Sequence, residues 1–130
     1  MTPPLVTAPA TPQNDSPAAT VELVAGGMPT RYTPYYQGTT LTRIEEERQA
    51  DDRSERGEYE FYGARLVRYY GAPLASGGTL ELKFDVDGGL VSASHSQRAV
   101  QETDIAAIRG RASLLRNHAL AQHATMTHGH

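Results

Sequence analysis

Residues 80–91 have the sequence LELKFDVDGGLV, and their pattern is the clearest indication of the fold in this sequence. Apolar and charged side chains alternate from Leu80 to Phe84, which is the pattern of a β-strand with one buried face. Asp87 and Gly88 then interrupt the strand, and an Asp-Gly pair suits the positive φ angles of a tight hairpin turn. A second apolar segment follows, so we predict a β-hairpin with its turn at these two residues.

The same arrangement occurs twice more, earlier in the chain. Residues 35–44 read YYQGTTLTRI and residues 59–69 read YEFYGARLVRY, each with one Gly between two alternating segments. Gly63 and Ala64 are expected to form the turn of the second of these hairpins. Three hairpins in succession predict one antiparallel β-meander, because consecutive strands usually pair with their neighbours.

An acidic segment, residues 45–60, joins the first hairpin to the second and contains eight acidic residues and three arginines. Glu and Arg at spacings of three and four residues are compatible with a solvated helix, whereas residues 51–54, with the sequence DDRS, suit a turn between two long strands. We favour the hairpin because residues of strong strand propensity lead into the segment. With further alternating segments at residues 21–24 and 30–36, six or more strands are expected between residues 21 and 95.

The period changes after residue 100, where apolar residues recur at steps of three and four. This spacing places them on one side of an α-helix. The apolar stripe consists of Ile105, Ile108, Ala112, Leu115 and Ala119. We predict a helix over residues 104–120 that starts near Thr103, a suitable N-cap, and ends near Ala121. A single amphipathic helix of this length is not stable alone, so it is expected to pack on the sheet, and the fold class is α+β.

The first twenty residues differ in composition from the rest. They hold five of the eight prolines together with Ala and Thr, a mixture that favours extended, solvated backbone. We therefore expect a disordered Pro/Ala/Thr-rich tether over residues 1–20, a single α+β domain over residues 21–121 and a flexible His-containing tail over residues 122–130.

Composition argues against several classes of function. The formal net charge is −3 and the isoelectric point is near 5.9, which provides no basic surface for nucleic acid. Cys is absent, so disulfides, thiolate catalysis and Cys-based metal sites are excluded. No stretch reaches the roughly 20 apolar residues that cross a bilayer, and no signal peptide is recognisable at the start.

In layout, the chain resembles small bacterial envelope lipoproteins, in which a Pro/Ala/Thr-rich spacer joins a lipid anchor to a compact β-rich domain. The resemblance rests on residues 1–20 and the hairpins that follow, and the lipid-accepting Cys of that group is not in this sequence. It implies a location in the periplasm or at the outer membrane, with membrane contact only through an anchor that this chain does not carry. A cytoplasmic location is the alternative.

Two clusters contain metal-ligating residue types. Four imidazoles lie near the end of the chain, at His118, His123, His128 and His130. Their spacings fit neither a helical zinc site nor a zinc knuckle, so we assign them to a disordered tail. The acidic segment lacks the ligand order and central Gly of an EF-hand, which favours a solvated surface. No metal or other cofactor is expected.

Catalytic motifs are not recognisable in the sequence. Ser92, Ser94, His95 and Ser96 are close together, but neighbouring residues of a strand point to opposite faces, which separates a nucleophile from its base. No glycine-rich phosphate loop, paired-histidine motif or nucleophile elbow occurs. We therefore expect a non-catalytic protein.

Tyrosine is the main candidate for binding. Seven Tyr accompany two Phe and no Trp, and exposed Tyr is a common anchor of protein interfaces because it combines contact area with a hydroxyl group. The residues expected to bind a partner are Tyr35, Tyr36, Tyr62, Tyr69 and Tyr70. Cross-strand packing within the sheet is the structural alternative.

These observations lead to two functional hypotheses. In the first, the protein is a non-catalytic envelope module that binds another protein through a Tyr-bearing sheet face, for example as an inhibitor or immunity-type protein. In the second, it is a cytosolic or phage-encoded accessory domain that binds a small ligand in the curved sheet. A signal peptide and a lipid-accepting Cys encoded upstream would support the first, and a natural start at Met1 would support the second.

Overall fold

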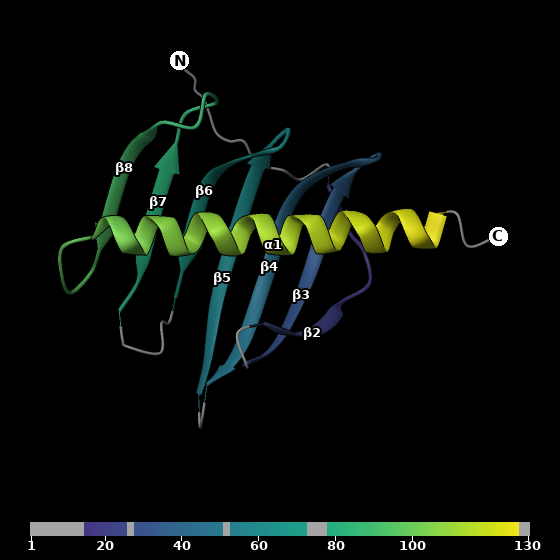
Figure 1. Ribbon diagram of the computed structural model, residues 1–130, viewed down its shortest axis with the longest axis horizontal. Coiled ribbons are helices and arrows are strands. Elements are labelled where there is room, and N and C mark those ends of the chain that lie inside the picture. Colours follow the sequence, from purple (N-terminus) through teal and green to yellow (C-terminus); the bar gives the residue numbers. More distant parts are fainter. Residues whose placement is uncertain (1–14, 26–27, 51–52, 73–77, 128–130) are drawn as a thin grey trace, which may run out of the picture.

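The computed structural model describes residues 15–25, 28–50, 53–72 and 78–127. Within these residues it contains one antiparallel sheet, and one long helix crosses a face of that sheet (Figure 1). The elements are β1 (Ser16–Pro17), β2 (Val21–Ala25), β3 (Met28–Gln37), β4 (Thr40–Ala50), β5 (Arg53–Tyr62), β6 (Arg65–Gly71), β7 (Leu80–Phe84), β8 (Leu90–His95) and α1 (Glu102–Thr127). The predicted α+β class with a C-terminal helix is confirmed.

The strands follow one another across the sheet in the manner of a meander. From β3 to β8 each strand pairs antiparallel with the next strand in the chain. β1 and β2 both pair with β3, each along a different part of it. The sheet has eight strands within the described residues, which agrees with the expectation of six or more.

The acidic segment folds as the hairpin that the sequence analysis favoured over a helix. β4 and β5 are both long strands and pair antiparallel over most of their length. Residues 51 and 52, at the predicted turn, lie outside the described residues. At the other two predicted turns, Gly63 has a φ of 62° and Gly88 a φ of 97°, which residues with a side chain rarely adopt.

The start of α1 differs from the prediction, because Gln101 rather than Thr103 precedes the first helical residue. The backbone amide of Gln101 donates to the carboxylate of Asp104 at 2.8 Å, and this back-bonding from the third helical residue is typical of a helix start. Arg98 donates to both oxygens of the same carboxylate, at 2.8 and 3.0 Å. The bonds from Arg98 and Gln101 lower the pKa of Asp104 to about 2.

The end of α1 also differs, since the helix continues to Thr127, beyond the predicted end near Ala121. The imidazole of His123 stacks on the ring of Tyr36, with ring centroids 4.4 Å apart, and this contact holds the additional turn against the sheet. Residues 122–127 are therefore helical rather than part of a flexible tail. Residues 128–130 lie outside the described residues.

The predicted tether boundary at residue 20 is corrected as well. β1 lies before this boundary and pairs with β3, and the amide of Ala18 donates to the carbonyl oxygen of Pro34 at 2.8 Å. Residues 15–20 therefore belong to the domain, while residues 1–14 lie outside the described residues. A strand of two residues has no alternation from which the sequence could have predicted it.

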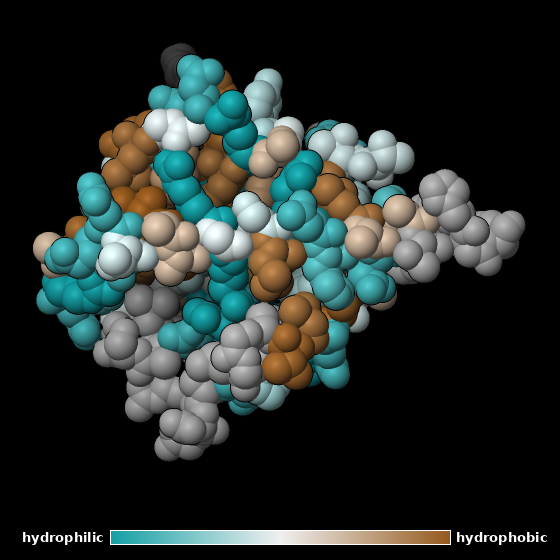
Figure 2. Space-filling model, in the orientation of Figure 1, coloured by the Kyte–Doolittle hydropathy of each residue, from teal (hydrophilic) through white to brown (hydrophobic). Residues whose placement is uncertain are grey.

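The core lies between α1 and the sheet face that it crosses. Of the predicted apolar stripe, Ile108, Ala112, Leu115 and Ala119 are buried. Buried sheet residues at alternating positions face them, namely Tyr32, Tyr36, Leu41, Ile44, Tyr59, Phe61, Tyr69, Leu80, Leu82 and Phe84. Burying one large apolar side chain contributes about 1.5–3 kcal/mol. Figure 2 shows this side of the molecule, with apolar side chains still visible beside α1 over β7 and β8, so the helix covers only a strip of this face.

Candidate functional site

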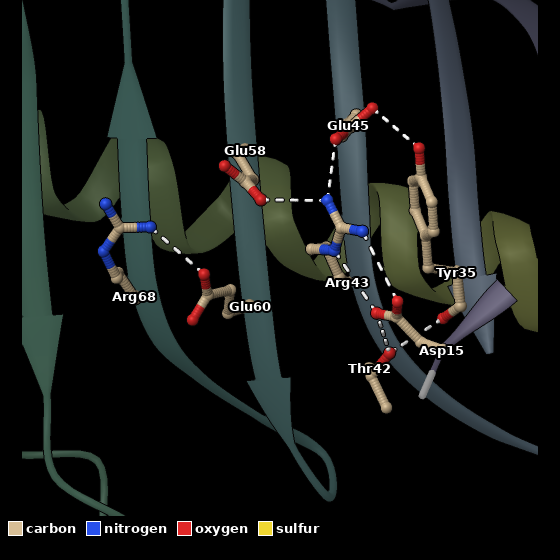
Figure 3. Close-up of polar contacts among 8 residues, drawn as sticks. All are labelled: Asp15, Tyr35, Thr42, Arg43, Glu45, Glu58, Glu60 and Arg68. Atoms are coloured by element: carbon tan, nitrogen blue, oxygen red, sulfur yellow. Dashed lines mark hydrogen bonds and ion pairs between the residues drawn. The ribbon is translucent and has the colours of Figure 1, made fainter. Parts of the chain in front are cut away.

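The sheet face opposite α1 carries no helix within the described residues, and we call it the open face. Figure 3 shows part of it, with α1 behind the sheet. Side chains alternate along each strand, so the neighbours of core residues in β3 to β7 point to the open face. Most of these neighbours are charged, in contrast to the apolar side chains of the core.

The strand register arranges the charges of the open face in rows that run across the strands. The acidic row consists of Glu45, Glu58 and Glu81, with Tyr70 between the last two. The basic row consists of Arg43, Arg68 and Lys83, with Glu60 between the first two. A third row, on the other side of the acidic row, consists of Arg31, Glu47 and Arg56. Glu45 and Glu58 therefore lie between two rows that contain cations, which offsets the repulsion between these like charges on adjacent strands.

Arg43 is the central cation of this network. Its Nη1 donates to Glu45 at 2.7 Å and to Glu58 at 3.1 Å, two carboxylates that face each other across β4 and β5. Its guanidinium carbon lies 3.8 Å from the ring centroid of Tyr35. Burial alone lowers the pKa of Arg43, but the hydrogen bonds and charges of its acidic partners, Asp15 first among them, raise it above its ordinary value. Arg43 thus links the acidic row to the basic row.

Asp15 is a residue of this network that the sequence analysis missed, because it falls in the segment assigned to the tether. Its side chain is only 3% exposed. It accepts hydrogen bonds from the hydroxyl of Thr42 at 2.9 Å and from Nε of Arg43 at 3.3 Å (Figure 3). A lone Asp beside a Pro-rich stretch carries no local signal of a partner 28 positions away.

Arg68 repeats this arrangement two strands away. It donates to Glu60 and to Glu81, both at 3.1 Å, and its guanidinium carbon lies 5.6 Å from the ring centroid of Tyr70. As at Arg43, burial alone lowers the pKa of Arg68, and its acidic partners raise it above the ordinary value. Arg68 of β6 is therefore paired with one carboxylate of β5 and one of β7.

A groove of about 430 Å³ lies on the open face, lined by both the acidic row and the third row. Among the residues that line it, the charged and aromatic ones with side chains on the open face are Glu45, Glu47, Glu58, Arg31, Arg56 and Tyr70. Arg31 donates to Glu47 at 3.1 Å, and Arg56 lies 3.8 Å from the same carboxylate. The side chains of Arg31 and Arg56 are 53% and 69% exposed, so both guanidiniums can bind a further molecule.

The five Tyr residues expected to bind a partner divide between the two faces of the sheet. Tyr36 and Tyr69 are 7% and 1% exposed beneath α1, so the expectation that they lie on an accessible face is wrong. Burial raises the pKa of Tyr69 to about 12. Each of the two adjoins an accessible Tyr in sequence, because neighbouring strand residues point to opposite faces. Tyr35 is half-buried, Tyr70 is 38% exposed and Tyr62, beside the β5–β6 turn, is 66% exposed.

A second polar cluster lies beneath α1 and was also missed, since the acidic segment was interpreted as a solvated surface. The side chain of Glu46 is 2% exposed and accepts hydrogen bonds from the hydroxyl of Tyr59 at 2.7 Å and from Nε of Arg111. Arg111 also donates to the hydroxyl of Thr30 at 2.9 Å. Burial and the charge of Glu46 raise the pKa of Tyr59 well above its ordinary value. This cluster joins α1 to β3, β4 and β5.

The two histidines of α1, His118 and His123, take part in contacts between the helix and the sheet. Nδ1 of His118 lies 2.6 Å from the hydroxyl of Tyr32, and His123 stacks on Tyr36. These two residues therefore do not belong to a disordered tail, while residues 128 and 130 lie outside the described residues. In the part of the chain that the structure describes, no group of three or more His, Asp or Glu residues is arranged to hold a metal ion.

Comparison with known proteins adds no assignment. No protein-family model, curated protein or solved structure matches the chain. Although α1 is 26 residues long, it is too polar to span a membrane.

Proposed function

We propose that the protein is a non-catalytic binding module that takes up a partner protein on the open face. The observation that carries this proposal is the groove of about 430 Å³, whose lining combines three carboxylates and two exposed guanidiniums with the accessible ring of Tyr70. Tyr and Arg are enriched in protein interfaces, where they provide contact area and directional hydrogen bonds. A partner segment with both acidic and basic side chains would complement this lining.

The chemistry of the lining favours a polar protein segment over an apolar small molecule. A volume of about 430 Å³ is within the range of small-ligand sites, about 300–1,000 Å³, but those sites are mostly apolar. Charged side chains dominate here, and an extended protein segment can satisfy many of them at once. The second candidate is a small polar ligand in the same groove, as expected for an accessory domain, and the volume of the groove favours it.

Residues in the groove and beside it have different expected roles. Among the described residues, the ion pair of Arg56 is with Glu47 at 3.8 Å, and the ring of Tyr70 is accessible, so both Arg56 and Tyr70 are expected to contact the partner directly. Arg43 is already bonded to several carboxylates and is expected to position them. Truncation of a central Tyr or Arg in an interface often costs more than about 2 kcal/mol of binding free energy.

We further propose that the module acts in the bacterial envelope, as an inhibitor or immunity-type protein. The Pro/Ala/Thr-rich composition of residues 1–20 and the layout shared with small envelope lipoproteins support this location. Fractionation of the native host, with protease protection of the intact cells, tests it. Recovery of the full-length protein in the cytosol would contradict the envelope location and favour the accessory-domain alternative.

Site-specific crosslinking in the native host tests the binding face. A photoreactive phenylalanine analogue in place of Tyr70 is expected to give a discrete protein adduct. The same analogue in place of Leu114, which is 46% exposed on α1, serves as the control. Arg56→Ala should reduce the adduct from position 70 and leave the melting temperature unchanged, since this side chain is exposed.

The outcomes separate the two candidates. Equal adducts from positions 70 and 114, or an adduct that Arg56→Ala does not reduce, would contradict binding on the open face. A dialysable compound that raises the melting temperature of the wild type but not of Arg56→Ala, without any protein adduct, would select the small-ligand candidate.

A further inference from the structure

A second cavity, of about 180 Å³, lies between α1 and the two turns that join β5 to β6 and β7 to β8. Both turns lie at the same end of the sheet, at its upper edge in Figure 1, while α1 crosses the middle of the sheet. The polar side chains that line the cavity are those of Arg65, Arg109, Ser113 and Arg116, with Phe61 among the apolar ones. One water molecule needs about 10–15 Å³ of such space, so a polyatomic ion fits.

The charge of this cavity is positive, because three guanidiniums and no carboxylate line it. Arg65 donates to the carbonyl oxygen of Asp87 and Arg109 to that of Gly88, both at 2.7 Å. Carbonyl groups orient the guanidiniums without neutralising them. Within the described residues, none of the three arginines forms an ion pair.

The carboxylate of Asp85, in the β7–β8 turn, is already engaged elsewhere. It accepts hydrogen bonds from the amides of Asp87 at 2.9 Å and of Gly89 at 2.8 Å, which closes its own turn. The Asp85 carboxylate therefore stabilises its own turn, and it forms no ion pair with the guanidiniums of the cavity within the described residues.

Arg116 provides a separate indication of a missing acceptor. Its Nε is buried and has no hydrogen-bond partner within the described residues. Native proteins rarely leave a charged donor in this state, because the lost hydration is not compensated. Arg109, Ser113 and Arg116 recur at steps of four and three on one side of α1, so an acceptor between them would contact all three.

We propose that this cavity binds a tetrahedral oxyanion of the phosphate monoester class. A guanidinium matches phosphate oxygens in geometry and forms short, charge-assisted hydrogen bonds to them. A phosphate monoester carries a charge of about −1.5 to −2 at neutral pH and has three acceptor oxygens, which suits three guanidiniums and one hydroxyl better than a carboxylate does. The cavity lies apart from the open face, so this proposal does not depend on the proposed function.

Titration of the full chain with inorganic phosphate, followed by nuclear magnetic resonance, tests the proposal. We expect saturable shifts at the amides of Gly88 and Ser113, and none of this size with chloride at the same ionic strength. Arg65→Gln and Arg116→Gln should each weaken phosphate binding about tenfold or more, because each removes a charge-assisted hydrogen bond. Arg56→Gln removes the same charge from the open face and should leave the affinity within about twofold.

Arg65 is exposed, so its variant keeps the test valid even where Arg116→Gln impairs folding. Co-sedimentation with phosphatidic acid vesicles, lost in Arg65→Gln, would identify a lipid headgroup as the source of the phosphate. Saturation by inorganic phosphate without co-sedimentation would identify a soluble ester. Shifts that do not saturate, equal shifts with chloride, or equal weakening by Arg56→Gln would overturn the proposal.

Discussion

The buried ion pair between Glu46 and Arg111 joins β4 to α1, and the substitution Glu46→Gln tests how strongly it holds the helix on the sheet. The two side chains are 2% and 14% exposed, and the carboxylate also accepts the hydroxyl of Tyr59 at 2.7 Å. Gln keeps the shape of the side chain and removes its charge. The guanidinium of Arg111 then stays largely desolvated without its counterion.

Removing one member of a buried ion pair costs about 3–5 kcal/mol, because the other charge remains desolvated. We expect about 3 kcal/mol for Glu46→Gln, since the Gln oxygen still accepts one hydrogen bond and Arg111 retains its bond to Thr30 at 2.9 Å. This is a large part of the roughly 5–15 kcal/mol that stabilises a folded domain. With an m-value of about 2 kcal/mol/M in urea, the unfolding midpoint should fall by about 1.5 M.

Urea unfolding followed by far-UV circular dichroism measures this loss. Glu47→Gln is the matched control, because its partner Arg31 is 53% exposed and such pairs contribute less than about 1 kcal/mol. The double variant Glu46→Leu with Arg111→Met removes both charges and should be less destabilised than Glu46→Gln. Equal midpoints for Glu46→Gln and Glu47→Gln, or a double variant less stable than Glu46→Gln, would refute desolvation of a lone charge as the cause.

Leu115→Ala should lower the free energy of unfolding by about 2–4 kcal/mol, whereas Leu114→Ala, at an exposed position of α1, should change it by less than about 0.5 kcal/mol; similar urea midpoints would contradict a docked helix. Burial raises the pKa of Tyr32 and Tyr69 from 10.0 to about 12, so the unfolded chain releases these protons first as the pH rises. Stability should therefore be retained below pH 10 and fall between about pH 10 and 12, and Tyr69→Phe should reduce the slope of the urea midpoint with pH. Asp15→Ala removes a nearly buried acceptor and should cost about 1–2 kcal/mol, seen as a lower melting temperature; an unchanged melting temperature would place this residue outside the domain.

The meander and the docked helix could be predicted because both depend on patterns within short stretches of sequence. Leu80, Leu82 and Phe84 alternate along one strand, and all three are buried. Ile108 and Leu115 recur at helical steps and are buried beneath the same helix. Removal of apolar surface from water favours these patterns directly, so local periodicity is sufficient to recognise them.

The side of the sheet to which each side chain points could also have been inferred from the sequence once the core residues were assigned. Ile44 and Glu46 are two positions apart in one strand and therefore share a face. With Ile44 in the core, Glu46 has to be buried, and a buried carboxylate requires a cationic or hydrogen-bonding partner. Arg111, four residues before Leu115, is a cation on the same side of α1 as the apolar stripe.

The charged rows of the open face could not be predicted in the same way, because they depend on strand register. Bulges between Tyr35 and Tyr36 and between Glu60 and Phe61 shift the pairing by one residue. A shift of one residue changes which charges face each other across two strands, and no local pattern reports it. The contacts of Asp15 depend in addition on a two-residue strand that has no period.

The arginines of this chain differ in their partners, and this difference determines how each site can bind. On the open face, Arg43 and Arg68 are paired with carboxylates of the same chain, so a ligand there has to offer many contacts to compensate for those it displaces. At the cavity beside α1, Arg65 and Arg109 bond only to carbonyl groups and Nε of Arg116 has no partner among the described residues, so a single oxyanion displaces no carboxylate. Added salt should slow the association of a partner with the exposed charges of the open face. It should affect oxyanion binding at the half-buried Arg116 less, because a partly buried charge is screened less. The abundance of Arg in the composition cannot by itself assign a function, since the affinity of an arginine for an external anion depends on whether acids of the chain already neutralise it.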